Sequence, residues 1–354
     1  MSLKDSRKNI DAIDAKIISL LNDRAEISLA IGKEKVKNKK SIYAPGREKE
    51  IFKRIEILNK GPMSQEAFEA VYREVMSASL SLEKALQIAY LGPEASFTHL
   101  AAQKRFGSQV SYVPAINIAE VFQKVENGHC DYGVVPIENS IEGAVTHTFD
   151  LLVDSELKIC SQILLEISHN LLSKEAKDKI KKIYSKPEVF GQCRKWLQAE
   201  MPKAELIDVS STTRGAQIAV KEKNAACIAS SLAAKVYKLR MIKKDIEDSA
   251  HNITRFLVIT NNDVPPTGKD RTSILFSIKD KVGALHSMLE PFYKNKINLT
   301  KIESRPSKKK AWDYYFFVDF EGHREEKNVK KALAQLEDMC KYLKVLGSYP
   351  SLEP

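Results

Sequence analysis

The sequence predicts a multidomain protein that begins with an all-helical domain, continues with a two-lobed α/β domain, and ends with a small domain of βαββαβ order. With 354 residues the chain exceeds one typical hydrophobic core. Residues 1–87 show helical periodicity with almost no strand signal, whereas short apolar strands alternate with helices after residue 88. We expect domains at 1–87, 88–264 and 272–349, with a linker over 262–270 (NDVPPTGKD).

The first segment predicts three helices. Apolar residues recur at helical spacing from Ile10 to Ile31, and Ala44-Pro45-Gly46 ends this helix. A second helix follows, and Gly61-Pro62 ends it. Ser64 is the expected N-cap of a third helix that runs to about Gln87. Because three such helices enclose little core, we expect them to pair with a second copy of the chain.

Composition and charge narrow the functional classes. Hydrophobic residues make up 43% and the net charge is +10, but no nucleic-acid-binding motif accompanies the basic residues. No apolar run is long enough for a bilayer, and the first residues lack a secretion signal. Five scattered cysteines, no metal-ligand spacing and no phosphate-binding loop favour a reduced, cytoplasmic protein without metal or cofactor. We therefore expect no nucleic-acid partner and no membrane association.

Polar residues interrupt the apolar faces of the first and third helices. Arg24 and Lys35 lie three turns apart, displaced by about 20° around the helix axis, beside the apolar stripe. Ser79 and Glu83 continue the stripe of the third helix. One such residue would indicate a salt bridge or a side chain reaching for solvent, since buried charge is costly without a partner. Together with Arg47-Glu48, the four predict a polar pocket inside a helical bundle.

This pattern resembles the all-helical chorismate mutases, which are intertwined dimers that convert chorismate to prephenate by a unimolecular rearrangement. Such a pocket must hold a folded dicarboxylate and stabilise negative charge on its ether oxygen. The resemblance implies a cationic wall of Arg7 from the partner chain, Arg24 and Arg47, with Lys35 and Glu83 at the ether oxygen and Glu48 and Ser79 on substrate hydroxyl or carboxylate. Some relatives carry an acid where this chain has Ala44.

In the central segment, several strands end in small polar turns at which helices begin. The turns lie in GPEASFTHLAA, PIENSIEGAV, VSSTTRGAQIAV and IASSLAAKV. Ordinary capping explains any one of them. Four in one domain predict a carboxylate-binding cleft built from helix N-termini, a device that solute-binding proteins share.

The same segment resembles prephenate dehydratases in YLGPEASFTHLAA, VVPIENSIEGAVTHTFDLL, YSKPEVFGQCRKWL, DVSSTTRGA and NITRFLVI. The resemblance implies two α/β lobes around a cleft in which prephenate loses its ring hydroxyl and carbon dioxide. Thr254 of the TRF motif would be the catalytic hydrogen-bond donor to the departing hydroxyl. The implied substrate-binding residues are Ser96, Asn139, Ser140, Ser211, Thr212, Arg255 and Phe256. The chain has Ala95-Ser96-Phe97 where relatives carry Gly-Thr-Phe, and Lys186 where they carry His.

The last segment predicts the ferredoxin-like order βαββαβ. We expect strands at Ser273–Ile278, Ile297–Glu303, Asp313–Phe320 and Tyr342–Leu346, with helices at Gly283–Lys294 and Glu325–Met339. GALHSMLEPF and KIESRP resemble the ACT regulatory domains of phenylalanine-responsive dehydratases, which pair across a dimer around the amino acid. The resemblance implies inhibition by L-phenylalanine, bound through Gly283, Ala284, Leu285, His286, Asn298, Glu303 and Ser304.

These resemblances cover nearly the whole chain and imply a bifunctional enzyme of phenylalanine biosynthesis that acts on chorismate and prephenate as a homodimer or larger homo-oligomer. Two alternatives remain. The helical segment could serve only dimerisation beside a monofunctional dehydratase, or the two-lobed segment could be a ligand sensor without catalysis.

Overall fold

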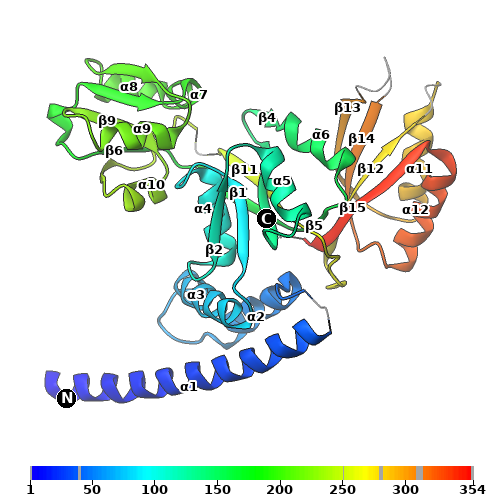
Figure 1. Ribbon diagram of the computed structural model, residues 1–354, viewed down its shortest axis with the longest axis horizontal. Helices are drawn as coiled ribbons and strands as arrows, with labels where there is room; N and C mark the ends of the chain where they lie inside the picture. The colour runs from blue at the N-terminus through cyan, green and yellow to red at the C-terminus, as the bar shows by residue number, and fades with distance from the viewer. Residues whose placement is uncertain (1, 39–40, 250, 279–281, 308–313, 352–354) are drawn as a thin grey trace. The chain divides into compact units, whose positions relative to one another are not determined.

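The computed structural model describes residues 2–38, 41–249, 251–278, 282–307 and 314–351. The chain divides into two compact units, which we describe separately. One contains residues 1–87 together with 105–111, and the other contains 88–104 together with 112–354 (Figure 1). The first unit therefore includes a short segment from beyond the predicted helical domain, and the second holds both the α/β part and the C-terminal part.

The helical unit contains α1 (Leu3–Lys37), α2 (Pro45–Leu58) and α3 (Gln65–Glu83). Ser64 caps α3 as expected, and Ser2 caps α1, which was not predicted. Each side chain accepts a backbone N–H of the first turn. The third helix ends at Glu83 rather than near Gln87, because Gln87 already begins a strand.

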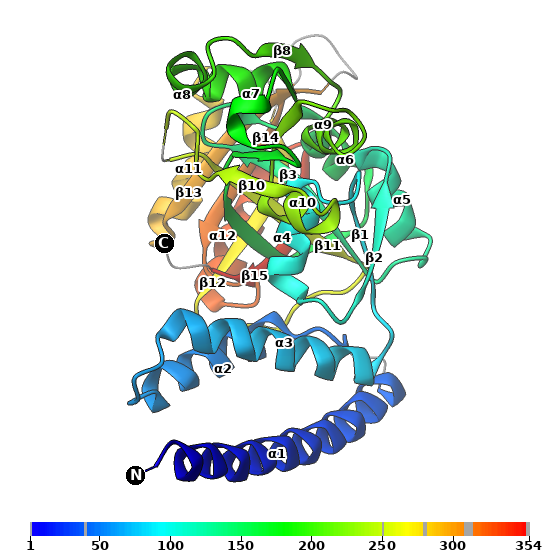
Figure 2. The same cartoon turned by 90° about the vertical axis from the view of Figure 1, so that its left-hand side faces the viewer.

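Most of α1 is exposed. Ser28 and Gly32 are its buried residues among those described, whereas Ile10 is 56% and Ile18 is 61% exposed. Figure 2 shows α1 separated from α2 and α3 along much of its length. The apolar face that the sequence indicates is thus present but largely uncovered within one chain.

The first α/β lobe contains a mixed sheet in the order β2-β1-β3-β11-β5, with β4 beside β3. Its strands are β1 (Gln87–Leu91), β2 (Ser111–Ala115), β3 (Tyr132–Asn139), β4 (Gly143–Ala144), β5 (Lys158–Glu166) and β11 (Ile253–Thr260), and its helices are α4 (Phe97–Phe106), α5 (Ile118–Glu126) and α6 (Thr146–Asp154). β1 and β3 are parallel, but β11 runs antiparallel to both β3 and β5.

The second lobe has the sheet order β10-β6-β9-β7-β8. Its elements are β6 (Asn170–Ser173), a 3₁₀ turn (Lys177–Lys179), β7 (Lys182–Ser185), α7 (Pro187–Gln192), α8 (Arg194–Glu200), β8 (Glu205–Asp208), α9 (Thr212–Ala219), β9 (Ala225–Ala229), α10 (Ser231–Val236) and β10 (Arg240–Lys243). β7 is parallel to β8 and β9, whereas β6 is antiparallel to β9 and β10. Both sheets are therefore mixed. In the first sheet the antiparallel strand is β11, which returns there from the second lobe.

The C-terminal part confirms the βαββαβ order. It contains β12 (Asp270–Ser277), α11 (Ala284–Lys294), β13 (Leu299–Pro306), β14 (Tyr314–Glu321), α12 (Lys327–Met339) and β15 (Tyr342–Pro350). These strands form an antiparallel sheet in the order β13-β14-β12-β15. Asp313, the expected start of the third strand, lies outside the described residues. None of the helices in the described ranges combines the length and apolarity that crossing a bilayer requires.

Candidate active sites

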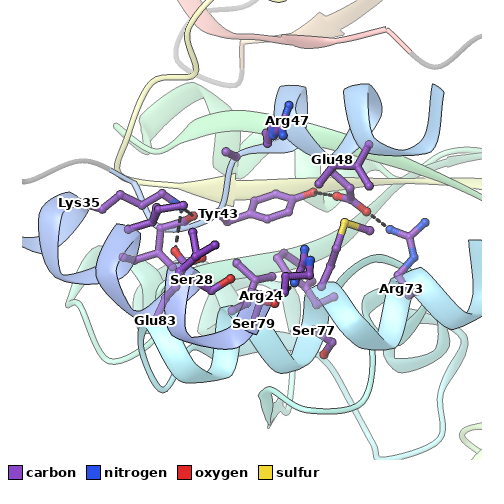
Figure 3. Close-up of a pocket in the computed structure, with 18 of the residues that line it drawn as sticks. Arg24, Ser28, Lys35, Tyr43, Arg47, Glu48, Arg73, Ser77, Ser79 and Glu83 are labelled. Atoms are coloured by element: carbon purple, nitrogen blue, oxygen red, sulfur yellow. Dashed lines mark hydrogen bonds and ion pairs between the residues drawn. The ribbon is translucent and has the colours of Figure 1, made fainter. Parts of the chain in front are cut away.

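A cavity of about 660 Å³ lies in the helical unit. It is lined by six of the seven side chains predicted for the first site: Arg24, Lys35, Arg47, Glu48, Ser79 and Glu83. Figure 3 shows these residues converging from α1, α2 and α3. A volume of this size is typical of small-molecule sites.

Two contacts join α1 to α3 across the cavity. Arg24 Nη1 donates to Ser79 Oγ, and Ser79 Oγ donates to the carbonyl of Val75 at 2.9 Å. Lys35 Nζ lies 2.8 Å from Glu83 Oε2 and also donates to the carbonyl of Ile42 at 2.7 Å. The polar residues that interrupt the apolar stripes of α1 and α3 therefore contact one another across the two helices.

Glu48 is an enclosed carboxylate of the cavity, with its side chain 9% exposed. Tyr43 Oη donates to Glu48 Oε2 at 3.1 Å, and Arg73 pairs with Oε1 (Figure 3). Arg105 Nη2 lies 3.4 Å from Oε2 and Arg105 Nε donates to Tyr43 Oη. Burial, and then the neighbouring Arg105, lower the pKa of Arg73 to about 10. The sequence analysis identified Glu48 but missed these three partners.

The charges of the cavity favour an anionic ligand. Five cationic side chains line it, namely Arg24, Lys35, Arg47, Arg73 and Arg105, against the three carboxylates of Asp23, Glu48 and Glu83. The lining thus carries an excess of two positive charges, which matches a small dicarboxylate. Apolar side chains, among them Ile27, Ile31 and Leu80, complete the lining.

Two predicted cations lie differently. Arg7 is exposed on α1 and does not line the cavity. It precedes Arg24 by 17 residues of continuous helix, which corresponds to about 25 Å. Arg47 lines the cavity edge, but its Nη1 pairs with Glu50 Oε2 at 2.7 Å and its side chain is 63% exposed.

The second candidate site surrounds Thr254 on β11. β3 and β11 are neighbours, and their register places Thr254 opposite Asn139. Asn139 Nδ2 donates to Thr254 Oγ1 at 2.8 Å and to Asn252 Oδ1 at 2.7 Å. Because Thr254 accepts this bond, its own hydroxyl proton remains available for a ligand.

A hydrogen-bonded chain that the sequence analysis missed continues from this pair. Asn252 Nδ2 donates to Gln192 Oε1 at 3.1 Å, and Nε2 of His169 lies 2.7 Å from the same oxygen. Gln192 Nε2 donates to Glu142 Oε1 at 2.9 Å. Burial lowers the pKa of His169, which favours the neutral ring. A neutral imidazole and amides fix the orientation of Asn139 without adding charge.

The other predicted residues of this site lie on separate turns. Ser140 Oγ donates to the carbonyl of His251 at 2.7 Å and accepts the N–H of Ile253 at 2.9 Å, so it borders Thr254. Ser96 Oγ accepts the N–H of His99, and Ser211 caps α9. Thr212 is buried in the first turn of α9. Ser96 Oγ also donates to the carbonyl of Leu91 at 2.8 Å. Within the described ranges, these hydrogen bonds of Ser96 and Ser211 stay close in sequence and do not join them to Thr254.

Arg255 and Phe256 differ from the rest of the TRF motif. The Arg255 guanidinium is 2.7 Å from Asp319 Oδ2 on β14 and donates to Tyr349 Oη on β15 at 3.0 Å. Phe256 is 2% exposed. Because successive side chains of a strand point to opposite faces, the Arg255 guanidinium contacts the C-terminal sheet on the face of β11 opposite to Thr254.

The predicted effector residues lie on two elements. Gly283 precedes α11 with φ of +77°, a left-handed conformation that suits glycine, and Leu285 is 37% exposed. Ala284 is buried and His286 exposed in the first turn of α11. Asn298 Nδ2 donates to Glu321 Oε1 at 3.2 Å. Glu303 and Ser304 lie on β13, which forms an edge of its sheet. The described contacts do not bring the β13 residues to α11.

Three family models match the chain: chorismate mutase type II over residues 6–84, prephenate dehydratase over 88–264, and the ACT domain over 272–338. A bifunctional chorismate mutase/prephenate dehydratase of Aquifex aeolicus is 50% identical over 353 residues, covering 98% of each chain. A protein of the same description from Pseudomonas aeruginosa is 44% identical and covers 98% of this chain and 97% of its own.

A solved prephenate dehydratase from Arthrobacter aurescens, in complex with L-Phe, superposes with a TM-score of 0.70 at 31% identity. The match covers 75% of this chain and 90% of that structure.

Proposed function

This chain belongs to the family of bifunctional chorismate mutase/prephenate dehydratases, and from that premise we propose which of its residues perform each reaction. The cavity of the helical unit is the chorismate site, and the surroundings of Thr254 are the prephenate site. The observation that carries the first assignment is the convergence of Arg24, Lys35, Glu48, Ser79 and Glu83 on one cationic cavity.

In the mutase reaction the protein holds one conformer rather than supplying a nucleophile. Arg24 and Arg47 bind substrate carboxylates, aided by Ser79, and restrict the substrate to the folded form in which the new bond can close. Lys35 and Glu83 hydrogen-bond the ether oxygen, on which negative charge grows as its bond to carbon breaks. Glu48 accepts a hydrogen bond from the substrate hydroxyl.

In the dehydratase reaction the electrons of the bond to the departing carboxylate enter the ring as the ring hydroxyl leaves. Thr254 donates a hydrogen bond to that hydroxyl, which leaves as hydroxide and takes a proton from solvent to become water, and aromatisation drives the step. Asn139, by donating to Thr254 Oγ1, stabilises the charge that develops on this oxygen. Ser96, Ser140, Ser211 and Thr212 offer hydroxyls and backbone N–H groups to the two carboxylates.

We also propose a homodimer or larger homo-oligomer in which the α1 helices pair. The exposed apolar residues of α1 support it, since a stable helix of this length normally covers its apolar face. Arg7 lies too far along α1 from Arg24 to reach the same cavity, so it would enter the cavity of the partner subunit. If the helices served only dimerisation, their charged cavity would have no ligand to bind.

Inhibition by L-phenylalanine at the ACT part completes the proposal. The exposed N–H groups at the start of α11 suit an α-carboxylate, Leu285 offers an apolar wall, and Glu303 suits an ammonium group. We place the enzyme in the cytoplasm, which its five free thiols support.

Selective loss of each activity tests the assignment. In the full chain, Arg24→Ala should lower mutase kcat with chorismate by about 10²–10³, the cost of one preorganised donor, and leave the dehydratase unchanged. Thr254→Ala should lower phenylpyruvate formation from prephenate by a comparable factor and leave the mutase unchanged.

Lys33→Ala, an exposed neighbour of Lys35 outside the cavity, is the matched control for the first variant. Thr254→Ser keeps the hydroxyl and should retain much of the dehydratase activity. Loss of both activities in a folded Arg24 or Thr254 variant would contradict the division into two sites.

A further inference from the structure

Residues 105–111 lie inside the stretch matched by the dehydratase family, yet they pack as part of the helical unit. The N–H of Gln109 donates to Ser77 Oγ at 3.0 Å, and the N–H of Ser108 donates to Glu74 Oε2 at 3.2 Å. Gly107 has φ of +74°, and a Cβ there would lie 2.6 Å from Ser77 Oγ. The close approach of this segment to α3 therefore requires glycine.

This docking brings two side chains into the wall of the cavity. Phe106 packs against the ring of Tyr43, with 4.9 Å between ring centroids. The guanidinium of Arg105 lies over the same ring at 5.5 Å and its side chain is 14% exposed. Both residues line the cavity beside Glu48.

Arg105 controls Glu48 in two ways. Its Nη2 lies 3.4 Å from Glu48 Oε2, and its Nε donates to Tyr43 Oη, which in turn donates to Oε2. Tyr43 has one proton, so accepting from Arg105 directs that proton to Glu48. Arg73 holds the other carboxylate oxygen. Both oxygens of Glu48 are thus fixed, and only a narrow set of directions remains for a ligand hydroxyl.

We propose that Arg105 is a positioning residue of the mutase site, which orients Glu48 directly and through Tyr43. The inference rests on the proposed role of this cavity as the chorismate site. It means that the mutase site is incomplete without a residue from the sequence of the dehydratase domain, and that Arg105 acts on the mutase reaction without touching substrate.

The experiment compares variants in the full-length protein, measuring mutase kcat and KM with chorismate and dehydratase activity with prephenate. Arg105→Ala should lower mutase kcat/KM by at least about tenfold, because a buried charged partner of Glu48 is lost. Arg105→Lys should recover only part of this loss, since an ammonium lacks the planar fork that reaches Tyr43 and Glu48 together. Lys104→Ala, an exposed neighbour on α4, is the matched control and should leave the mutase unchanged.

A double-mutant cycle with Glu48→Gln separates positioning from general structural damage. If Arg105 acts through Glu48, adding Arg105→Ala to the Glu48→Gln variant should lower mutase kcat/KM by less than about threefold. If the two residues act independently, the losses from the two substitutions should multiply. Unchanged far-UV circular dichroism reports that the helical unit of the variants is folded, and Arg105→Lys decides the question if Arg105→Ala does not fold. Two results overturn this inference alone. One is mutase activity at the wild-type level in the Arg105 variants, and the other is losses from the two substitutions that multiply in the cycle. Absence of mutase activity in the wild type overturns the proposed function together with it.

Discussion

Glu83 presents the sharpest chemical question in the proposed mutase site. Its side chain is 8% exposed and accepts from Lys35 Nζ at 2.8 Å. A carboxylate only accepts hydrogen bonds, so Glu83 must be protonated to donate to the ether oxygen. Lys35 Nζ donates to this carboxylate in the free enzyme, and bound chorismate places its two negative charges in the same cavity. We therefore predict that Glu83→Gln, which donates at every pH, makes the mutase less sensitive to pH.

The size of the pH effect on mutase kcat/KM follows from the loss of one hydrogen-bond donor at the ether oxygen. Because only a protonated Glu83 can donate, wild-type kcat/KM should fall by about tenfold for each pH unit wherever this proton limits the reaction. The loss should level off at about 10²–10³, the cost of one donor at a developing oxyanion. The ratio of Glu83→Gln to wild-type kcat/KM should therefore rise about tenfold for each pH unit until it reaches that limit.

The assay is mutase kcat/KM for both proteins from about pH 6 to about pH 8.5, below the range in which an arginine with a pKa of about 10, such as Arg73, begins to lose its proton. Glu66→Gln, at the exposed start of α3, makes the same change of charge outside the cavity and should reproduce the wild-type profile. Parallel profiles for wild type and Glu83→Gln would refute the reasoning and assign Glu83 to the Lys35 ion pair alone.

Two further predictions concern packing and regulation. A Cβ at Gly32 would lie 2.8 Å from Glu83 Cα. Gly32→Ala should therefore lower mutase kcat/KM, because overpacking costs about 1–3 kcal/mol against a gain of about 1 kcal/mol in helix propensity. Gly61→Ala, with open space around it, should leave the mutase unchanged. Leu285→Ala should raise the phenylalanine concentration for half-inhibition of the dehydratase by about tenfold, since losing an apolar contact costs about 1.5 kcal/mol or more. Tyr293 is exposed on the same helix, and Tyr293→Ala should leave inhibition unchanged. Inhibition that is altered by Tyr293→Ala but not by Leu285→Ala would contradict an effector site at Leu285.

Helical periodicity sufficed to predict where most of the first site lies. Arg24 and Lys35 interrupt one apolar stripe and Ser79 and Glu83 another, and the structure joins them in pairs across α1 and α3. Arg73 was within reach of the same reasoning, because it precedes Met76, Leu80 and Glu83 at spacings of one helix face. Nothing in the local sequence around Arg105 indicates its role, since that depends on packing between segments far apart in the chain.

The TRF motif illustrates a different limit. Resemblance grouped Thr254, Arg255 and Phe256 as one set around the substrate. Strand periodicity would have separated Arg255 from Thr254, because these two residues are adjacent in β11 and face opposite sides of its sheet. The irregular register between Arg255 and Phe256 could not be predicted from the sequence, and neither could the antiparallel return of β11 that sets Thr254 beside Asn139.

Two arginines have a partner outside their own family domain. Arg105 belongs to the stretch matched as dehydratase and pairs with Glu48 of the mutase stretch, while Arg255 of the dehydratase stretch pairs with Asp319 of the ACT stretch. A half-buried or buried charge that loses its partner destabilises the fold, typically by about 3–5 kcal/mol where burial is complete. Deleting residues 272–354 would remove Asp319 from Arg255, and cutting after residue 87 would remove Arg105 from Glu48. Such truncations therefore remove an ion pair of the remaining part as well as the other domain, and a point substitution such as Leu285→Ala tests regulation without that change.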